Sequence, residues 1–140
     1  MKRKLATLFA CLMLPTLLIT ILFYPKFPSP ALKAKYGIST PSNIKIKHYE
    51  WSGFGMDHSH VWLLEPADSL FVKALVDSAG LQPVPIDESQ SGLWSDWPAW
   101  WPQNHLETLP ERYYLEKRYE YWFIGVDREN DLIYVQWFDS

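Results

Sequence analysis

The chain has 140 residues, a formal net charge of −3 and one cysteine, so an internal disulfide framework is excluded. The charge is unevenly placed: residues 1–36 carry six Lys or Arg and no acid, and the rest of the chain carries seven cations and all 16 acids. That later part, with a formal charge of −9, repels phosphate groups. This argues against nucleic acid as a partner and disfavours lipid headgroup binding by the acidic part.

A basic amino terminus followed by a long apolar run is the first feature along the chain. Three cations at positions 2–4 precede an uncharged run from Leu5 to Tyr24. Twenty helical residues cover about 30 Å, the thickness of a hydrocarbon core, so residues 1–24 predict a transmembrane signal-anchor. A cleaved signal peptide is the alternative, but its apolar core is usually about 7 to 15 residues, and the best cleavage point, at 29–31, follows two prolines.

The cations also set the predicted orientation. Lys and Arg gather on the cytoplasmic side of a span, and here they cluster at the start of the chain. We therefore predict a single-pass protein of a bacterial-type inner (plasma) membrane, with its soluble domain outside the cytoplasm, in the periplasm. Residues 25–42 contain four prolines and predict a semi-extended stalk that holds the domain off the bilayer.

Residues 43–140 predict one α+β domain with the element order β-β-α-β-β-β. Residues 43–51 alternate apolar and polar side chains, the period of a half-buried strand, and residues 58–64 form a second candidate strand. A helical spacing of apolar residues then starts after Pro66 and stops at Gly80. These signals predict an antiparallel sheet with one helix packed on it.

The carboxyl-terminal third carries the strongest strand signals. Aromatic and branched residues fill three segments, which are Arg112–Lys117, Glu120–Val126 and Leu132–Phe138. The polar residues 127–131 predict a hairpin turn; a calcium loop is the alternative, but the motif's glycine and distal glutamate are missing. Gly125, inside a strand, predicts a bulge or a close backbone approach.

A tryptophan-rich stretch interrupts the domain. Residues 82–109 predict a long ordered loop, and its tryptophans are the candidate binding residues: Trp94, Trp97, Trp100 and Trp101. Spaced indoles between prolines predict either a rigid platform for a sugar, a proline-rich peptide or a protein, or side chains that pin the loop to the sheet.

The segment from Asp57 to His60 has the most reactive composition. On a strand, His58 and His60 point to the same face and can present two imidazoles to one Zn²⁺. A zinc site needs three or four ligands, and the other domain histidines, at 48 and 105, lie in unrelated contexts. The two are therefore weak metal candidates, and the sequence predicts neither a metal site nor a cofactor. Polar edge-strand histidines are the plainer interpretation, with acid-base or pH-sensing roles as a further one.

No catalytic residue is indicated by the sequence, because no activated nucleophile, carboxylate pair or phosphate-binding glycine loop is recognisable. It predicts a membrane-anchored, non-catalytic interaction domain whose partner is a protein or an envelope component. One version is an immunity-like protein whose acidic surface neutralises a basic toxin. One alternative is a cell-envelope hydrolase or sugar-binding enzyme using the tryptophans with Asp57, His58 and His60. The other is a structural subunit of a membrane complex. The oligomeric state is not indicated.

Overall fold

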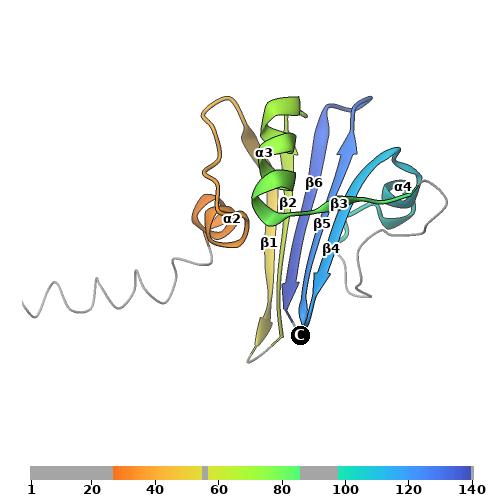
Figure 1. Cartoon of the computed structure of the whole chain (residues 1–140). Coiled ribbons are helices and arrows are strands. Elements are labelled where there is room, and N and C mark those ends of the chain that lie inside the picture. The colour runs from red at the N-terminus through yellow and green to blue at the C-terminus, as the bar shows by residue number, and fades with distance from the viewer. Residues whose placement is uncertain (1–26, 55–56, 86–97, 140) are drawn as a thin grey trace, which may run out of the picture.

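One antiparallel sheet forms the centre of the molecule. The structure is a computed structural model that describes residues 27–54, 57–85 and 98–139 (Figure 1). Within these ranges six strands lie in the order β1-β2-β6-β5-β4-β3, and every neighbouring pair is antiparallel. Their bounds are β1 (Lys45–Phe54), β2 (Asp57–Glu65), β3 (Gln82–Pro83), β4 (Glu111–Lys117), β5 (Glu120–Asp127) and β6 (Leu132–Asp139). The predicted α+β class with an antiparallel sheet is confirmed.

In the described residues three helices accompany the sheet, where the sequence predicted one packed helix. They are α2 (Pro28–Tyr36), α3 (Ser69–Ala79) and α4 (Gln103–Thr108). The element order among the described residues is therefore α2-β1-β2-α3-β3-α4-β4-β5-β6. This differs from the predicted β-β-α-β-β-β by two helices and one very short strand. Both added helices lie in proline-containing segments that predicted a stalk and a loop.

The helix predicted between Pro66 and Gly80 is present as α3. The Asp68 carboxylate accepts a 2.8 Å hydrogen bond from the Phe71 amide and caps its amino end. Gly80 ends it in the left-handed conformation, with φ of 71°. The helix leads the chain from β2 to the far edge of the sheet, where β3 pairs with β4.

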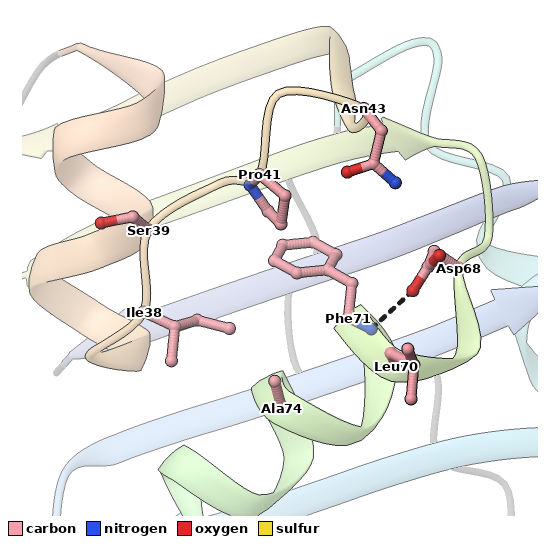
Figure 2. Close-up of a pocket in the computed structure, with 8 residues that line it drawn as sticks. All are labelled: Ile38, Ser39, Pro41, Asn43, Asp68, Leu70, Phe71 and Ala74. Carbon is pink, nitrogen blue, oxygen red and sulfur yellow. Dashed lines mark hydrogen bonds between the residues drawn. The ribbon is translucent and has the colours of Figure 1, made fainter.

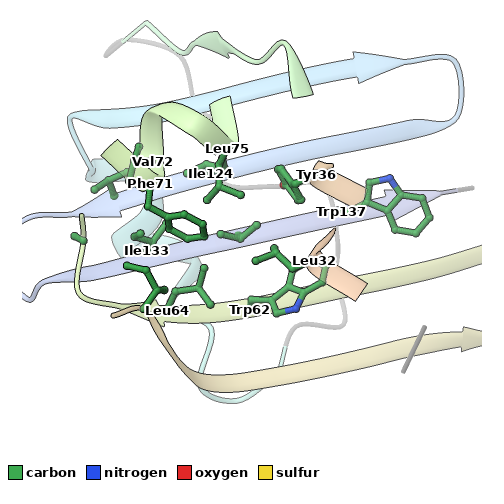
Figure 3. Close-up of a cluster of buried hydrophobic side chains, with 14 of the residues drawn as sticks. Leu32, Tyr36, Trp62, Leu64, Phe71, Val72, Leu75, Ile124, Ile133 and Trp137 are labelled. Carbon is green, nitrogen blue, oxygen red and sulfur yellow. The ribbon is translucent and has the colours of Figure 1, made fainter. Parts of the chain in front are cut away.

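The larger hydrophobic core lies between the sheet and the layer formed by α2 and α3, which we call the helix layer. Alternate residues of the central strands face this layer, and Figure 3 shows how they meet the helices. The buried side chains include Leu32, Tyr36, Trp62, Leu64, Phe71, Val72, Leu75, Ile124, Ile133 and Trp137. We call this side of the sheet the helix face.

The opposite side of the sheet, which we call the α4 face, carries a second core. The alternate residues of β2, β5 and β6 pack there against α4 and the segment before it. The cluster contains Val61, Leu63, Trp101, Leu106, Leu109, Phe123 and Tyr134. Gly125 makes this possible, because a Cβ there would lie 3.2 Å from Leu109 Cδ1 and 3.3 Å from Leu106 Cδ2. The strand register shows no bulge at Gly125, and the groups that come close to it are side chains and not another backbone segment.

Helix α2 replaces the semi-extended conformation predicted for residues 28–36. Prolines fit the first turn of a helix, where their missing N–H costs nothing, and Gly37 ends α2 in the left-handed conformation. Its Leu32 and Tyr36 are buried against the sheet. The Trp62 indole N–H also donates a 2.9 Å hydrogen bond to the Pro28 carbonyl. Residues 28–36 therefore pack as part of the domain core.

The predicted transmembrane segment lies outside the described residues. Within residues 27–54, 57–85 and 98–139, no helix combines the length and the apolar character needed to cross a bilayer. The signal-anchor over residues 1–24 stays a prediction from the sequence.

Candidate functional site

Strand β2 places His58 and His60 on the helix face, as the strand alternation predicts. His60 is buried, and its ring stacks on that of Trp62 with centroids 5.5 Å apart. Its Nδ1 lies 2.9 Å from the Tyr49 hydroxyl, within hydrogen-bond distance. The next strand contributes Trp137, which is paired in register with His60 and contacts its ring. His60 is thus enclosed by aromatic side chains from three strands.

The surroundings keep His60 neutral. Burial, with smaller contributions from the positive charges of Lys35 and His58, lowers the pKa of His60 to about 3. Burial also raises the pKa of Tyr49 well above its ordinary value. An effective general base has a pKa near the working pH, so this pair is poorly suited to move protons near neutrality. Tyr49 and His60 therefore form a partly buried hydrogen bond between two neutral side chains.

A row of neighbouring polar residues, His58, Asp139 and Glu120, lies next to this aromatic group at one end of the sheet. His58 pairs in register with Asp139, which in turn pairs with Glu120 on β5. The Nδ1 of His58 has no hydrogen-bond partner among the described residues. Lys35 reaches over from α2, with its Nζ 3.2 Å from the centre of the Trp137 ring. Burial lowers the pKa of Lys35, although Glu120 and Asp139 oppose this shift.

This row does not form a metal centre in the described part of the chain. No group of three or more His, Cys, Asp or Glu side chains is placed there to hold an ion. Asp57 begins β2, but its side chain lies outside the described part, so its proposed partnership with the two histidines is untested.

The described tryptophans of the loop have different environments. Trp101 is buried and packs edge-on against Tyr134 of β6, with ring centroids 5.6 Å apart. Trp100 is only half-buried and stacks on His48 of β1, with centroids 5.3 Å apart and planes inclined by 20°. Trp94 and Trp97 lie outside the described residues. Trp101 thus fixes this part of the loop to the sheet, and Trp100 lies at the surface beside it.

A histidine and an aspartate that sequence reasoning did not connect are paired on the same face. The Nε2 of His105 on α4 lies 2.6 Å from Oδ2 of Asp127, a buried carboxylate at the end of β5. The backbone and side-chain amides of Asn130 donate to the same carboxylate at 3.0 and 2.8 Å. Burial alone would raise the pKa of Asp127, but the hydrogen bonds from Asn130 and His105 outweigh it and lower the pKa. The pair ties α4 to the β5–β6 turn.

A shallow pocket lies on the outer side of the helix layer (Figure 2). It has a volume of about 350 Å³ and lies between α3 and the segment that joins α2 to β1. Its lining residues are Ile38, Ser39, Pro41, Asn43, Asp68, Leu70, Phe71 and Ala74. Leu70, one of these residues, is 80% exposed. Sequence reasoning missed this pocket because the segment before β1 predicted a stalk.

The surface around Trp100 is the strongest candidate for recognition in the described residues. The Trp100 indole there is partly buried against the second core, stacked on His48 and backed by the buried Trp101. By contrast, His60 is buried and a partner could not reach it, and the His105–Asp127 pair holds α4 to the β5–β6 turn. No protein-family model, curated protein or solved structure matches this chain.

Proposed function

We propose that this protein is a single-pass, membrane-anchored binding module whose domain lies outside the cytoplasm and recognises a protein or an envelope component. The recognition surface is the described end of the tryptophan-rich stretch, around Trp100, on the α4 face. The observation that supports this proposal is the partly exposed Trp100 indole, held against His48 while its neighbour Trp101 is buried. The role is non-catalytic and needs no cofactor.

A partly exposed tryptophan held in one position is well suited to binding. Tryptophan is enriched among the residues that contribute most to interface affinity, since it buries a large apolar area with little conformational freedom to lose. Stacking on His48 reduces that freedom before any partner arrives. Glu50, two residues further along β1, is exposed on the same face and adds a negative charge. The acidic balance of residues 37–140, with seven cations against 16 acids, suits a basic partner, as in the immunity-like version.

The state of His60 supports binding over catalysis. The enzyme alternative requires an imidazole that exchanges protons near neutral pH, whereas burial lowers the pKa of His60 to about 3. His58 is the one feature that favours the alternative, because its Nδ1 lacks a partner among the described residues and its strand neighbour is Asp139. Binding is therefore the function that we propose first.

The test is crosslinking in cells followed by affinity capture of the full-length chain. Three forms are compared: the natural sequence, Trp100→Ala and Tyr119→Ala. Tyr119 is the matched control, because it is an aromatic side chain, 66% exposed, on the β4–β5 turn. We expect Trp100→Ala to lower partner recovery by at least about tenfold, the effect of losing a principal interface residue. Equal recovery with all three forms would contradict the proposed surface.

The enzyme alternative has its own test. Purified full-length chain is incubated with isolated cell-wall polymer, and the release of soluble fragments is measured. The double variant Asp57→Asn, His58→Gln removes the acid-base groups without touching the buried His60. Fragment release by the natural chain and its loss in the double variant would favour the hydrolase over the binding module.

A further inference from the structure

We propose that β1 pairs with β1 of a second copy of this chain, so that the two sheets join into one continuous antiparallel sheet. The pairing is centred on Tyr49 and places Glu50 of each copy opposite His48 of the other. This goes beyond the proposed function, because it assigns a partner to the open edge of the sheet. The pairing itself does not depend on the membrane anchor.

The two edges of the sheet differ in how far they are protected. Among the described residues, β1 has a strand neighbour on one side only, and it runs for ten residues without a proline (Figure 1). The other edge is β3, which has two residues, one of them Pro83. Very short strands and edge prolines prevent pairing with another chain, whereas a long edge strand presents main-chain N–H and C=O groups to a further strand. The β1 edge is therefore the one suited to pairing.

The side chains of β1 are apolar on one face and polar on the other. Those on the helix face are aromatic or branched and partly buried, and they are Ile46, Tyr49 and Trp51. On the α4 face, Lys47, His48 and Glu50 are exposed. Lys47 is the extra residue of a bulge between Ile46 and His48, and it pairs with Glu65 of β2. A second strand beside β1 would complete the burial of the first group and meet the charges of the second.

The faces of β1 select the register. Residues opposite each other in an antiparallel pair lie on the same face of the sheet. Centring the pair on Tyr49 meets this condition on both faces when the bulge residue is left out. It brings Ile46 of one copy opposite Trp51 of the other on the helix face, and His48 opposite Glu50 on the α4 face.

The charges of β1 favour this register over its neighbours. In it, the carboxylate of Glu50 lies opposite His48 and beside the ammonium group of Lys47, and opposite charges across strands are stabilising. A pair centred on Glu50 would place the two carboxylates opposite each other, which is unfavourable. A pair centred on Trp51 would leave Glu50 opposite Ser52. The strand is thus most complementary to itself when Tyr49 is at the centre.

The symmetry of the pair is compatible with two anchors in one membrane. Antiparallel strands of one sheet are related by a two-fold axis perpendicular to the sheet, so the helix faces of both copies point the same way. Both α2 helices, which begin at Pro28, then lie on one side of the joined sheet. Anchoring in one bilayer raises the effective concentration of the two copies, which favours a contact of modest size. This step, unlike the pairing, rests on the proposed function.

The second copy also adds a group to the surface around Trp100. The Trp100 indole stacks on His48, and Glu50 of the second copy lies opposite that same His48. Each Trp100 surface therefore receives a carboxylate from the other copy. The two Trp100 surfaces lie on the same side of the joined sheet, on either side of the two-fold axis.

The test is disulfide crosslinking of the full-length chain in a Cys11→Ala background. Two differently tagged forms are expressed together, one with Lys45→Cys and the other with Ser52→Cys, both at exposed positions. The proposed register places these two positions opposite each other, within the Cα separation of about 7 Å that a disulfide allows. Two copies of residue 45 lie roughly 20 Å apart along the strands. The control pair is Lys45→Cys with Asn104→Cys, an exposed position on α4.

After copper-catalysed oxidation of the membrane and soluble fractions, we expect a dimer that carries both tags. It should be several-fold more abundant than with the control pair, and Lys45→Cys alone should give none. Equal yields from the two pairs would overturn the pairing, and a dominant dimer from Lys45→Cys alone would overturn the register. The expected dimer in the soluble fraction would contradict the anchor and still support the pairing.

Charge reversal tests the contact between Glu50 and His48. Glu50→Lys in both tagged forms should lower the yield of the mixed dimer several-fold, because a cation then meets Lys47 and His48. Glu129→Lys, the same charge change at an exposed position in the β5–β6 turn, should leave the yield unchanged. Glu50→Lys in one form with His48→Glu in the other should restore the yield. A yield no higher than with Glu50→Lys in both forms would refute this contact.

Discussion

The hydroxyl of Tyr36 donates a 2.6 Å hydrogen bond to the main-chain carbonyl of Gln136, one hundred residues later in the chain. Tyr36 is the last residue of α2, and Gln136 lies in β6 at the middle of the sheet. The bond is buried, and Tyr36 also packs edge-on against Trp62. A segment rich in proline is thereby fixed to the most central part of the fold.

Truncating α2's buried leucine should destabilise the whole domain. Leu32 is fully buried, so Leu32→Ala should lower the free energy of unfolding by about 2–4 kcal/mol through lost burial and a cavity. Leu70→Ala is the control, because that side chain is 80% exposed and should change stability by less than about 0.5 kcal/mol. Urea unfolding of the full chain measures both. Equal stability of the two variants would show that residues 28–36 are not part of the core.

A side chain at Gly125 should loosen α4. The Cβ of Gly125→Ala would meet the methyl groups of Leu106 and Leu109 at 3.2 to 3.3 Å, which forces them to move. We expect the free energy of unfolding to fall by about 1 kcal/mol. This is at the low end of the range for overpacked cores, because the ends of leucine side chains can move to make room. Hydrogen exchange should quicken in α4 while α3 is unchanged. The double variant Gly125→Ala, Leu109→Ala should cost less than the sum of the single changes, and strict additivity would contradict this contact.

His60 should make the domain sensitive to mild acid. Its folded pKa, about 3, lies below the ordinary value of 6.5, so the unfolded chain binds the proton more readily between these two values. Stability contributed by the neutral imidazole is therefore present above pH 6.5 and is lost as the pH falls toward 3, with a slope of at most about 1.4 kcal/mol per pH unit. His60→Gln should remove this slope. The free energy of unfolding is measured by urea unfolding at several values between pH 3 and 6.5. If it changes with pH as steeply in His60→Gln as in the natural sequence, His60 is not the cause of the acid sensitivity.

Asp127 should affect the stability of the domain over a lower pH range than His60 does. Its pKa in the folded chain is lowered, so its ionised form stabilises the fold above the unfolded value of about 3.9, and this gain is lost as the pH falls through the folded value. Asp127→Asn should cost about 1–3 kcal/mol at neutral pH, because the hydrogen bonds lose their charged acceptor. Glu129→Gln, exposed in the same turn, should cost almost nothing. Thermal unfolding across pH compares the two, and equal losses would refute the role of the buried carboxylate.

Much of the sheet could be predicted from local patterns. The sequence predicts a strand over 132–138 because that segment is rich in branched and aromatic residues, and in the structure the strand continues by one residue, to Asp139. Helix α3 followed from its cap residues, since Asp68 and Gly80 are local signals. The strand and the ends of α3 depend on residues close together along the chain, so the sequence alone is enough to predict them.

The other two helices depend on tertiary contacts. Helix α2 buries only three apolar residues, Ala31, Leu32 and Tyr36, and the prolines in and around it favour an extended chain when the sequence is read alone. Helix α4 has six residues and no side-chain cap at its amino end. Both form because the sheet offers a surface that fits them, and neither carries enough periodicity to be predicted alone.

The candidate site needed the structure for the same reason. Trp100 and Trp101 are adjacent, yet one lies at the surface on His48 and the other is buried beside Tyr134. Which of these two tryptophans is buried depends on how α4 packs over Gly125. The His105–Asp127 pair joins residues 22 positions apart, and no spacing rule connects them.

The most direct measurement is the accessibility of the domain in intact cells. In a Cys11→Ala background, Tyr119→Cys places a thiol on the exposed β4–β5 turn, and a membrane-impermeant maleimide reports which side of the membrane it is on. The membrane fraction is then extracted with alkaline carbonate. We predict labelling without cell lysis and retention of the labelled chain in the membrane. Labelling only after lysis, or release of the chain into the soluble fraction, would contradict an anchored binding module outside the cytoplasm.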